Sequence, residues 1–144
     1  MEQGFVFSSD PAESAHQHAA YDVVHRYEQL LNAGDTAGIL KLYAPESVAE
    51  WKDKPSFVTA RHKEDAYNAA FKVAKFSTVF GYASIEDDGE IEVVGTYHHK
   101  GATIVESGKE VVDLNREVFL LRKIGNEMKT VLYIFNANPL QGEG

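Results

Sequence analysis

The sequence of 144 residues contains no cysteine. Disulfide bonds, thiol catalysis and cysteine-ligated metal sites are therefore excluded. The sequence also lacks an uninterrupted apolar stretch long enough to span a membrane, and its first residues, MEQGFVFSSD, have neither the basic segment nor the apolar run of a signal peptide. We therefore expect a soluble, cytoplasmic protein with no membrane partner.

Basic residues are scarce relative to acidic ones. Lys and Arg together number 14, against 22 Asp and Glu, which gives a formal net charge of −8. Such an acidic surface disfavours nucleic acid and anionic membranes as partners, because both carry the same sign of charge. It places no restriction on a small neutral ligand.

The motifs of several enzyme classes are missing too. The sequence has no HExxH zinc motif, no glycine-rich phosphate loop and no GxSxG nucleophile motif. His98 and His99 are adjacent in a predicted strand and so face opposite sides, which prevents them from sharing a metal ion. We therefore expect neither a metal site nor a cofactor.

Apolar residues make up 44% of the chain, which is enough for a core at this length. No internal repeat and no linker divides the sequence. We therefore expect a single domain over residues 10–136, with flexible tails at 1–9 and 137–144.

Three helices are predicted in the first half of the chain. The Asp-Pro pair at 10–11 is typical of a helix start, apolar residues then recur at helical spacing, and Gly34 ends the helix. Asp35 can cap a second helix, which carries Tyr43 on its apolar side and ends at the next proline. The third helix is predicted over 61–74.

The second half is rich in β-branched and aromatic residues, which favour strands. Strands are predicted at 76–86, 91–106, 111–123 and 128–135, with one more short strand at 47–51. The tight-turn sequences DDGE, SGKE and IGNE separate the four long strands, so we expect these strands to be antiparallel. The fold class predicted is α+β, with the helices packed on one face of the sheet.

The last predicted strand is apolar on both sides. Tyr133 and Phe135 alternate with Leu132 and Ile134. Since the helices can cover only one face, the other face needs a cover, and a second copy of the chain is the simplest one. We therefore predict a homodimer that forms through the outer face of the sheet.

Polar residues fall on the predicted inner face of the strand at 111–123. Asn115 and Glu117 precede Phe119 on that face, which is the pattern of a strand that leaves a core and lines a cavity mouth. A strand end that simply projects into water would show the same pattern. Tyr27 lies on the apolar side of the first helix, and a buried tyrosine hydroxyl needs a partner, which Asn115 or Glu117 could supply.

These residues carry a resemblance to a known family. The segment RYEQLLNAGDTAGILKLYAPESVAE, at 26–50, resembles the first part of bacterial ketosteroid isomerases, within the nuclear transport factor two-like and SnoaL-like superfamily. The segments KPSFVTARHKEDAYNAAF, NREVFLLRK and YIFN are similar to a less characterised group of small bacterial SnoaL-like proteins. The resemblance implies a cone-shaped fold, a curved antiparallel sheet around helices, with a pocket at its open end and commonly a dimer.

The resemblance also implies roles for individual residues. Tyr27 matches the tyrosine that holds the oxyanion in the isomerases, and Glu117 falls at the position of their protonated carboxylic acid. The general base of the isomerases is an aspartate, but the ungapped match puts Trp51 at its position. Asp53, two residues on, is either a displaced base or a solvated loop residue.

We therefore predict a pocket that takes a small, largely apolar organic ligand. Tyr27, Glu117 and Asp53 are the candidate catalytic residues. The candidate ligand-binding residues are Trp51, Tyr97, His99, Asn115, Phe119, Tyr133 and Phe135. Two functions stay open: cofactor-free acid/base chemistry of the isomerase, cyclase or dehydratase class, and a non-catalytic ligand-binding or dimeric interaction module.

Overall fold

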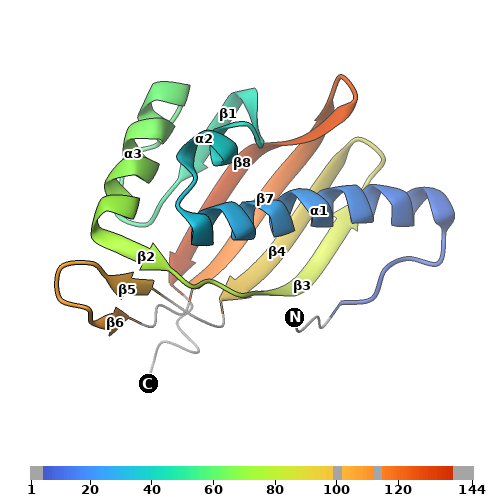
Figure 1. Ribbon diagram of the computed structural model, residues 1–144. Coiled ribbons are helices and arrows are strands. Elements are labelled where there is room, and N and C mark those ends of the chain that lie inside the picture. Colours follow the sequence, from blue (N-terminus) through green and yellow to red (C-terminus); the bar gives the residue numbers. More distant parts are fainter. Residues whose placement is uncertain (1–4, 99–101, 112–114, 138–144) are drawn as a thin grey trace.

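The structure is a computed structural model that describes residues 5–98, 102–111 and 115–137 (Figure 1). In chain order the elements are α1 (Pro11–Ala33), α2 (Thr36–Leu40), β1 (Tyr43–Glu50), α3 (Ala60–Val73), β2 (Ala74–Phe76), β3 (Phe80–Asp87), β4 (Ile91–His98), β5 (Ala102–Ile104), β6 (Glu110–Val111), β7 (Asn115–Ile124) and β8 (Glu127–Ala137). The helices lie in the first half of the chain and the strands β3 to β8 follow them, as predicted. No helix in these described ranges is both long and apolar enough to cross a bilayer.

The ends of the first helix are set by the residues that the sequence indicates. The Asp10 side chain accepts a hydrogen bond from the backbone amide of Glu13, which caps the N-terminus of α1. At the other end, Gly34 has φ 69°, and its amide bonds back to the carbonyls of Leu30 and Leu31. Asp35 then caps α2 through the amide of Gly38.

The larger of two sheets has five strands in the order β1-β8-β7-β4-β3, and the helices pack on one of its faces. The meander β3-β4-β7-β8 is antiparallel, which confirms the prediction from the turn sequences. The sequence pattern did not predict that β1 would pair with β8 in parallel, nor that β2, β5 and β6 would form a separate small sheet. The sheet is open and uncurled, and the α+β class with helices on one face is confirmed.

Three element predictions were wrong in their bounds. The predicted second helix ran through Tyr43, but α2 ends at Leu40 and Tyr43 begins β1. The predicted strand 91–106 is divided between β4 in the large sheet and β5 in the small one, and 111–123 is likewise divided between β6 and β7. Periodicity reports which side of a segment is apolar, but it does not report where a strand leaves one sheet for another.

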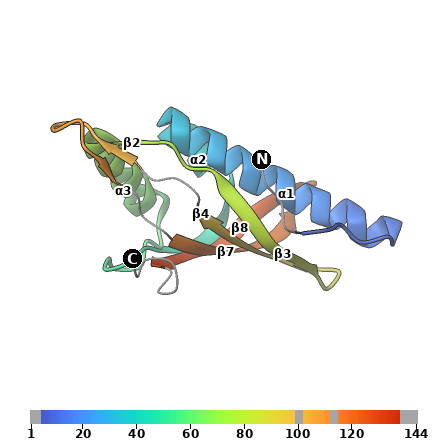
Figure 2. The same ribbon diagram turned by 90° about the horizontal axis from the view of Figure 1, so that it is seen from below.

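The sheet has one covered face and one open face, as the side view shows (Figure 2). On β7, Glu117, Phe119 and Leu121 are buried under the helices, while Val118 is 41% exposed on the opposite face. The inner residues continue across the register pairs, where Phe119 stands opposite Tyr133. The core therefore lies between α1 and this inner face.

Polar side chains of α1 tie it to β3, the edge strand. Glu28 accepts a hydrogen bond from the amide of Phe80, and the Asn32 amide group makes two bonds to the backbone of Thr78. Gln17 donates to the carbonyl of Ile85 near the other end of the strand. These buried side chains satisfy backbone groups that the edge of a sheet would otherwise leave without partners.

The residues before α1 also pack against the protein. The ring of Phe7 stacks on His18 with 3.7 Å between ring centroids, and Phe5 lies against Phe7. Both phenylalanines are partly buried against the core. Phe5 and Phe7 thus attach the segment before α1 to the rest of the protein.

The left-handed conformation at Gly34 gives the first testable prediction. We expect Gly34→Ala to lower the free energy of unfolding by about 1 kcal/mol, because an L-residue is strained at positive φ. A new Cβ would meet nothing closer than the Phe71 ring at 3.8 Å, so backbone strain is the only added cost. Urea denaturation measures the change.

Gly34→Asn serves as the control, because asparagine tolerates this conformation better than alanine does. It should recover part of the loss. Equal stability of the alanine variant and the wild-type protein would show that Gly34 is not needed for the end of α1.

Candidate functional site

Four tyrosines meet in the middle of the core, each from a different element. Tyr27 comes from α1, Tyr43 from the start of β1, Tyr67 from α3 and Tyr133 from β8, and each is at most 8% exposed. The Tyr67 hydroxyl lies 2.8 Å from the hydroxyls of both Tyr27 and Tyr43. Tyr133 packs beside Tyr27, with 5.4 Å between ring centroids. The hydroxyls of Tyr27, Tyr67 and Tyr43 therefore form one hydrogen-bonded chain within the cluster, which satisfies these buried polar groups.

Aromatic rings surround this chain of hydroxyls. The Tyr27 ring has Phe119 and Tyr133 at 5.5 and 5.4 Å between centroids, and it lies parallel to Phe80 at 6.4 Å. Phe119 and Tyr133 are themselves 4.7 Å apart. The predicted pocket residues Phe119 and Tyr133 are thus packed against Tyr27, and they fill the space beside it.

Glu117 is brought close to this group, as the alternation on β7 predicted. Its side chain is 2% exposed, and its Oε1 atom accepts a hydrogen bond of 2.7 Å from the Thr96 hydroxyl. Among the tyrosines, Tyr133 is the one that interacts electrostatically with Glu117. Burial raises the pKa of Tyr133 most, and the Glu117 carboxylate raises it further. Tyr133 therefore lies next to both Tyr27 and Glu117, the two groups expected to hold an oxyanion.

Burial determines the ionisation of all four phenols. It raises the pKa of Tyr27, Tyr43, Tyr67 and Tyr133 well above the ordinary value, and the neighbouring phenols add to the effect in each case. These tyrosines are neutral at physiological pH and can act only as hydrogen-bond donors and acceptors.

Trp51 and Asp53 take very different positions. The Trp51 ring packs on Tyr67 and Phe57 at 5.0 and 5.1 Å between centroids, and on Phe135 at 6.1 Å. It therefore covers the tyrosine cluster at the place where the resemblance expects a base. Asp53 is exposed in the following turn with φ 62°, which agrees with the solvated loop residue of the two alternatives.

The other predicted site residues are divided among different places. Phe135 lies beside Tyr133 at 5.9 Å, and Asn115 is partly exposed at the start of β7, on the same face as Glu117. Tyr97 stands opposite Arg116 and lies against Gly81 on the outer face, so it does not line the predicted pocket. His99 lies outside the described residues.

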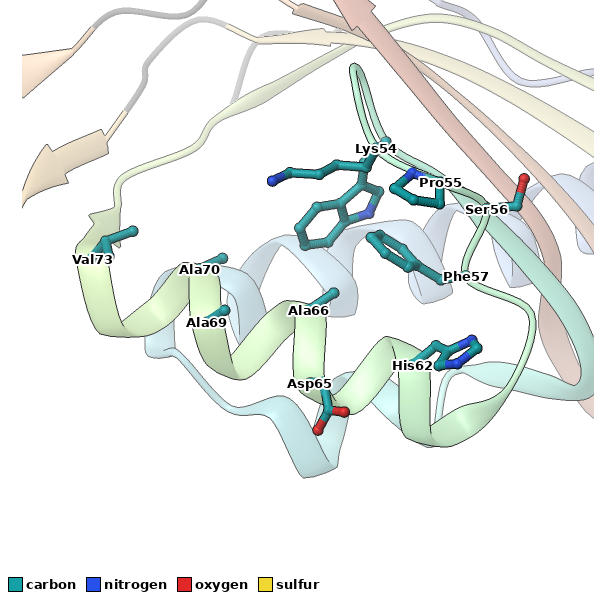
Figure 3. A pocket seen from close by; sticks show the side chains of 11 residues that line it. Lys54, Pro55, Ser56, Phe57, His62, Asp65, Ala66, Ala69, Ala70 and Val73 are labelled. Atoms are coloured by element: carbon teal, nitrogen blue, oxygen red, sulfur yellow. The ribbon is translucent and has the colours of Figure 1, made fainter.

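A cleft of about 720 Å³ lies between the loop after β1 and α3 (Figure 3). Phe57 and Pro55 face the helix from the loop side, and the helix presents a row of small side chains toward them. The residues that line it are Trp51, Lys54, Pro55, Ser56, Phe57, His62, Asp65, Ala66, Ala69, Ala70 and Val73. Of the predicted site residues that the structure describes, only Trp51 borders this cleft.

Sequence reasoning missed Tyr43, Tyr67 and most of the cleft. Tyr67 lies four residues before Phe71 on α3, a spacing that places both aromatic rings on the same side of the helix. That spacing was the available signal for Tyr67. The positions of Ala66, Ala69 and Ala70 opposite the loop depend on how the loop folds back, for which we find no signal in the sequence.

No protein-family model matches the sequence, and no curated protein matches it. Solved structures do match the fold. A ketosteroid isomerase-like protein from Erwinia carotovora atroseptica SCRI1043 has a TM-score of 0.79 at 17% identity, over 85% of this chain and 95% of that chain. An NTF2-like protein of unknown function from Pseudomonas putida KT2440 has a TM-score of 0.71 at 15% identity, over 87% and 88%.

A third structure, from Nostoc punctiforme, is described as having a cystatin-like fold. Its TM-score is 0.69 at 12% identity, and the match covers 96% of each chain. The chain therefore has the NTF2-like, cystatin-like fold, which confirms at the level of fold the resemblance seen in the sequence. Similarity at these identities defines the fold and leaves the activity to be argued from the site.

The tyrosine cluster predicts a loss of stability in alkali. A tyrosine in the unfolded chain ionises near pH 10, whereas the four buried phenols resist ionisation when folded. Their contribution is complete below pH 10 and is lost as the pH rises above it. We expect the free energy of unfolding to fall there by up to about 1.4 kcal/mol per pH unit for each tyrosine.

Urea denaturation between pH 8 and pH 11, a range that spans the ordinary tyrosine pKa of about 10, measures this slope. Tyr43→Phe should make it shallower, because one ionising group is gone. Phe119→Leu is the control, since it removes core packing but no hydroxyl and should lower stability equally at every pH. A wild-type slope no steeper than that of Tyr43→Phe would show that the phenols ionise freely in the folded state.

Proposed function

We propose that the protein binds a small, largely apolar organic molecule in the cleft between the loop after β1 and α3. The observation that carries the proposal is the cleft itself, whose volume of about 720 Å³ is that of a small-molecule site. Its position against Trp51 places a ligand outside the tyrosine cluster, which the protein fills with its own side chains.

The chemistry of the walls indicates the kind of ligand. Phe57 and Trp51 supply aromatic surface on one side, and the alanines of α3 supply a smooth apolar surface on the other. His62 lies at one end of the cleft and can orient a single polar group, whereas the Asp65 carboxylate points away from Trp51 and Phe57 and lies 3.6 Å from Arg61 (Figure 3). A flat, neutral molecule with one hydroxyl or carbonyl group suits these walls best.

Acid/base catalysis at the tyrosine cluster is the second candidate. The observation that favours it is Glu117, which is 2% exposed and lies beside Tyr133, whose ring packs against Tyr27. In this alternative the Tyr27 hydroxyl would donate a hydrogen bond to a developing oxyanion, and Glu117 would donate a second one only in its protonated, carboxylic acid form. Tyr133 would have to move aside for a substrate oxygen to reach them, and Trp51 would have to leave room for a base.

Trp51 is the only tryptophan in the chain, so its fluorescence reports directly on the cleft. We expect 2-naphthol, a flat phenol, to change this fluorescence in a saturable way. Ala69→Phe should weaken binding roughly tenfold or more, because a ring added on the exposed face of α3 occupies the cleft. Ala12→Phe, a matched change on the exposed side of α1, should leave the affinity unchanged.

The two candidates give opposite results with Tyr27→Phe. Binding in the cleft is insensitive to this change, because Tyr27 does not border the cleft. Binding at the cluster would be weakened by Tyr27→Phe and unaffected by Ala69→Phe. Saturable binding that survives Ala69→Phe would therefore refute the cleft as the site.

We further propose that the protein forms a homodimer through the outer face of the sheet. Val118 and Ile134 are 41% and 38% exposed at the centre of this face and stand opposite each other in the register. Leu120 and Leu132 form the next pair along and are only half-buried. A second copy placed on this face would cover both pairs.

Val118→Lys should convert a dimer into a monomer, because it places a charge in the middle of the apolar face. Sedimentation velocity at micromolar concentration measures the mass. Val58→Lys is the matched control, since Val58 is 56% exposed but lies in the loop before α3. A wild-type monomer at this concentration would contradict the proposal.

A further inference from the structure

A second group of chemically active side chains lies far from the cleft. His16 comes from the N-terminal half of α1, Asp87 from the end of β3 and Glu92 from the start of β4. One ligand-type atom from each lies within 4.8 Å of the others. This group is at the N-terminal end of α1, whereas α3 and the cleft are at the opposite end of the molecule in both views (Figures 1 and 2).

The β3–β4 hairpin itself brings the two carboxylates together. Asp87 and Glu92 are register partners across the hairpin, so their side chains leave the same face side by side. Like charges in directly opposed positions destabilise a strand pair. α1 adds a single imidazole against them, with 3.0 Å between His16 Nδ1 and Asp87 Oδ2.

One of these carboxylates is not satisfied by the protein. Both carboxylate oxygens of Asp87 have hydrogen-bond partners. The Oδ1 atom accepts a hydrogen bond of 2.9 Å from the Gly89 amide, and the Oδ2 atom lies 3.0 Å from His16 Nδ1. Glu92 is only 2% exposed, and its Oε1 atom has no hydrogen-bond partner among the described residues. A buried carboxylate oxygen without a partner is costly, so it indicates a group that the protein itself does not supply.

The electrostatics agree with the geometry. Burial, and then contact with the Asp87 carboxyl group, raises the pKa of Glu92 to about 7. The neighbouring Asp88 adds to the negative field, although its own Oδ1 atom accepts hydrogen bonds from the amides of Glu90 and Ile91 in the turn. The hairpin thus places two acidic side chains against a single imidazole.

We propose that His16, Asp87 and Glu92 bind a divalent first-row transition-metal ion, with zinc as the best match. One imidazole nitrogen and two carboxylate oxygens are ligands that zinc commonly uses. The two carboxylates balance its charge. The calcium and magnesium ions prefer six or more oxygen ligands, which this mixed set of three does not offer.

One pair of the three groups already has a separation that suits a bound zinc ion, and all three ligand atoms lie within 4.8 Å of one another. Ligand atoms around a tetrahedral zinc ion lie about 3.4 Å apart, given bond lengths near 2.1 Å. The existing separation of 3.0 Å between His16 and Asp87 is close to this value. The hydrogen bond from Gln17, next to His16, to the carbonyl of Ile85, near Asp87, already fixes α1 beside the strand.

Access and support are both available at this place. The His16 side chain is 42% exposed, so an ion can enter past it and keep water in a remaining coordination position. The Gly89 amide that bonds to Asp87 would orient this carboxylate from behind, as outer hydrogen bonds do in metal sites. A bound ion would join α1 to the β3–β4 hairpin.

The test uses the full-length protein after treatment with a chelator. Zinc chloride is titrated by calorimetry, and thermal denaturation is followed with and without zinc. We expect one tight equivalent of zinc and a melting temperature that rises with zinc concentration to a plateau. Magnesium and calcium at the same concentrations should give neither effect.

Variants decide whether the binding belongs to these residues. Glu92→Gln and His16→Gln should each weaken zinc binding roughly tenfold or more, since each removes a charge or a ligand. His18→Gln is the matched control, because His18 is an exposed histidine two residues along the same helix whose Nδ1 atom faces the Ser14 carbonyl. It should bind zinc as the wild-type protein does.

Three results would overturn the proposal. The first is no zinc binding by the wild-type protein at millimolar concentration. The second is binding of several weak equivalents, which would reflect scattered surface histidines. The third is a Glu92→Gln variant that binds as tightly as wild type while its circular dichroism spectrum shows that it is folded.

Discussion

The chain of tyrosine hydroxyls is the interaction on which the rest of the core depends. Tyr67 links Tyr27 and Tyr43, so α1, α3 and β1 each contribute a hydroxyl to this chain. Each hydroxyl is buried and finds its partner only when the other elements are in place. A single displaced element would leave polar groups unsatisfied in an apolar core, which is a strong constraint on how α1 and α3 sit over the sheet.

The same constraint shapes what the protein can do. An oxyanion site needs a tyrosine hydroxyl that a substrate oxygen can reach. Here Tyr133 lies beside both Tyr27 and Glu117, and Trp51 covers the tyrosines from the loop side, so this hydroxyl is enclosed. The cleft lies on the far side of Trp51 from the hydroxyls. The fold resembles that of ketosteroid isomerase-like proteins, yet the space between α1 and the sheet is filled by the protein's own aromatic rings. We propose that the ligand binds instead in the cleft outside Trp51.

How far the sequence predicts this arrangement depends on the range of the interaction. Helical spacing placed Tyr27 over the sheet, and strand alternation placed Glu117 and Phe119 on the inner face, because both are properties of one segment. The position of Tyr97 depends on register. Thr96 stands opposite Glu117, so Tyr97, opposite Arg116, lies on the other face of the sheet.

Longer-range features could not be read from local patterns. The hydrogen bond between Tyr27 and Tyr67 joins residues 40 positions apart, and the parallel pairing of β1 with β8 joins the first strand of the chain to the last described one. Tyr43 was assigned to a helix because it continues the apolar side of α2. The pairing with β8, where Tyr43 stands opposite Thr130, draws it into a strand instead.

The hydrogen bonds at the two rims of the large sheet bear on how copies of the protein can meet. On β3 the rim is occupied by side chains of α1, among them Glu28 on the Phe80 amide. On β1 the amide and carbonyl of Ala49 are both bonded to Phe57, from the loop that follows it. These bonds satisfy some of the backbone groups along each edge, which disfavours the addition of a strand from another molecule at these places.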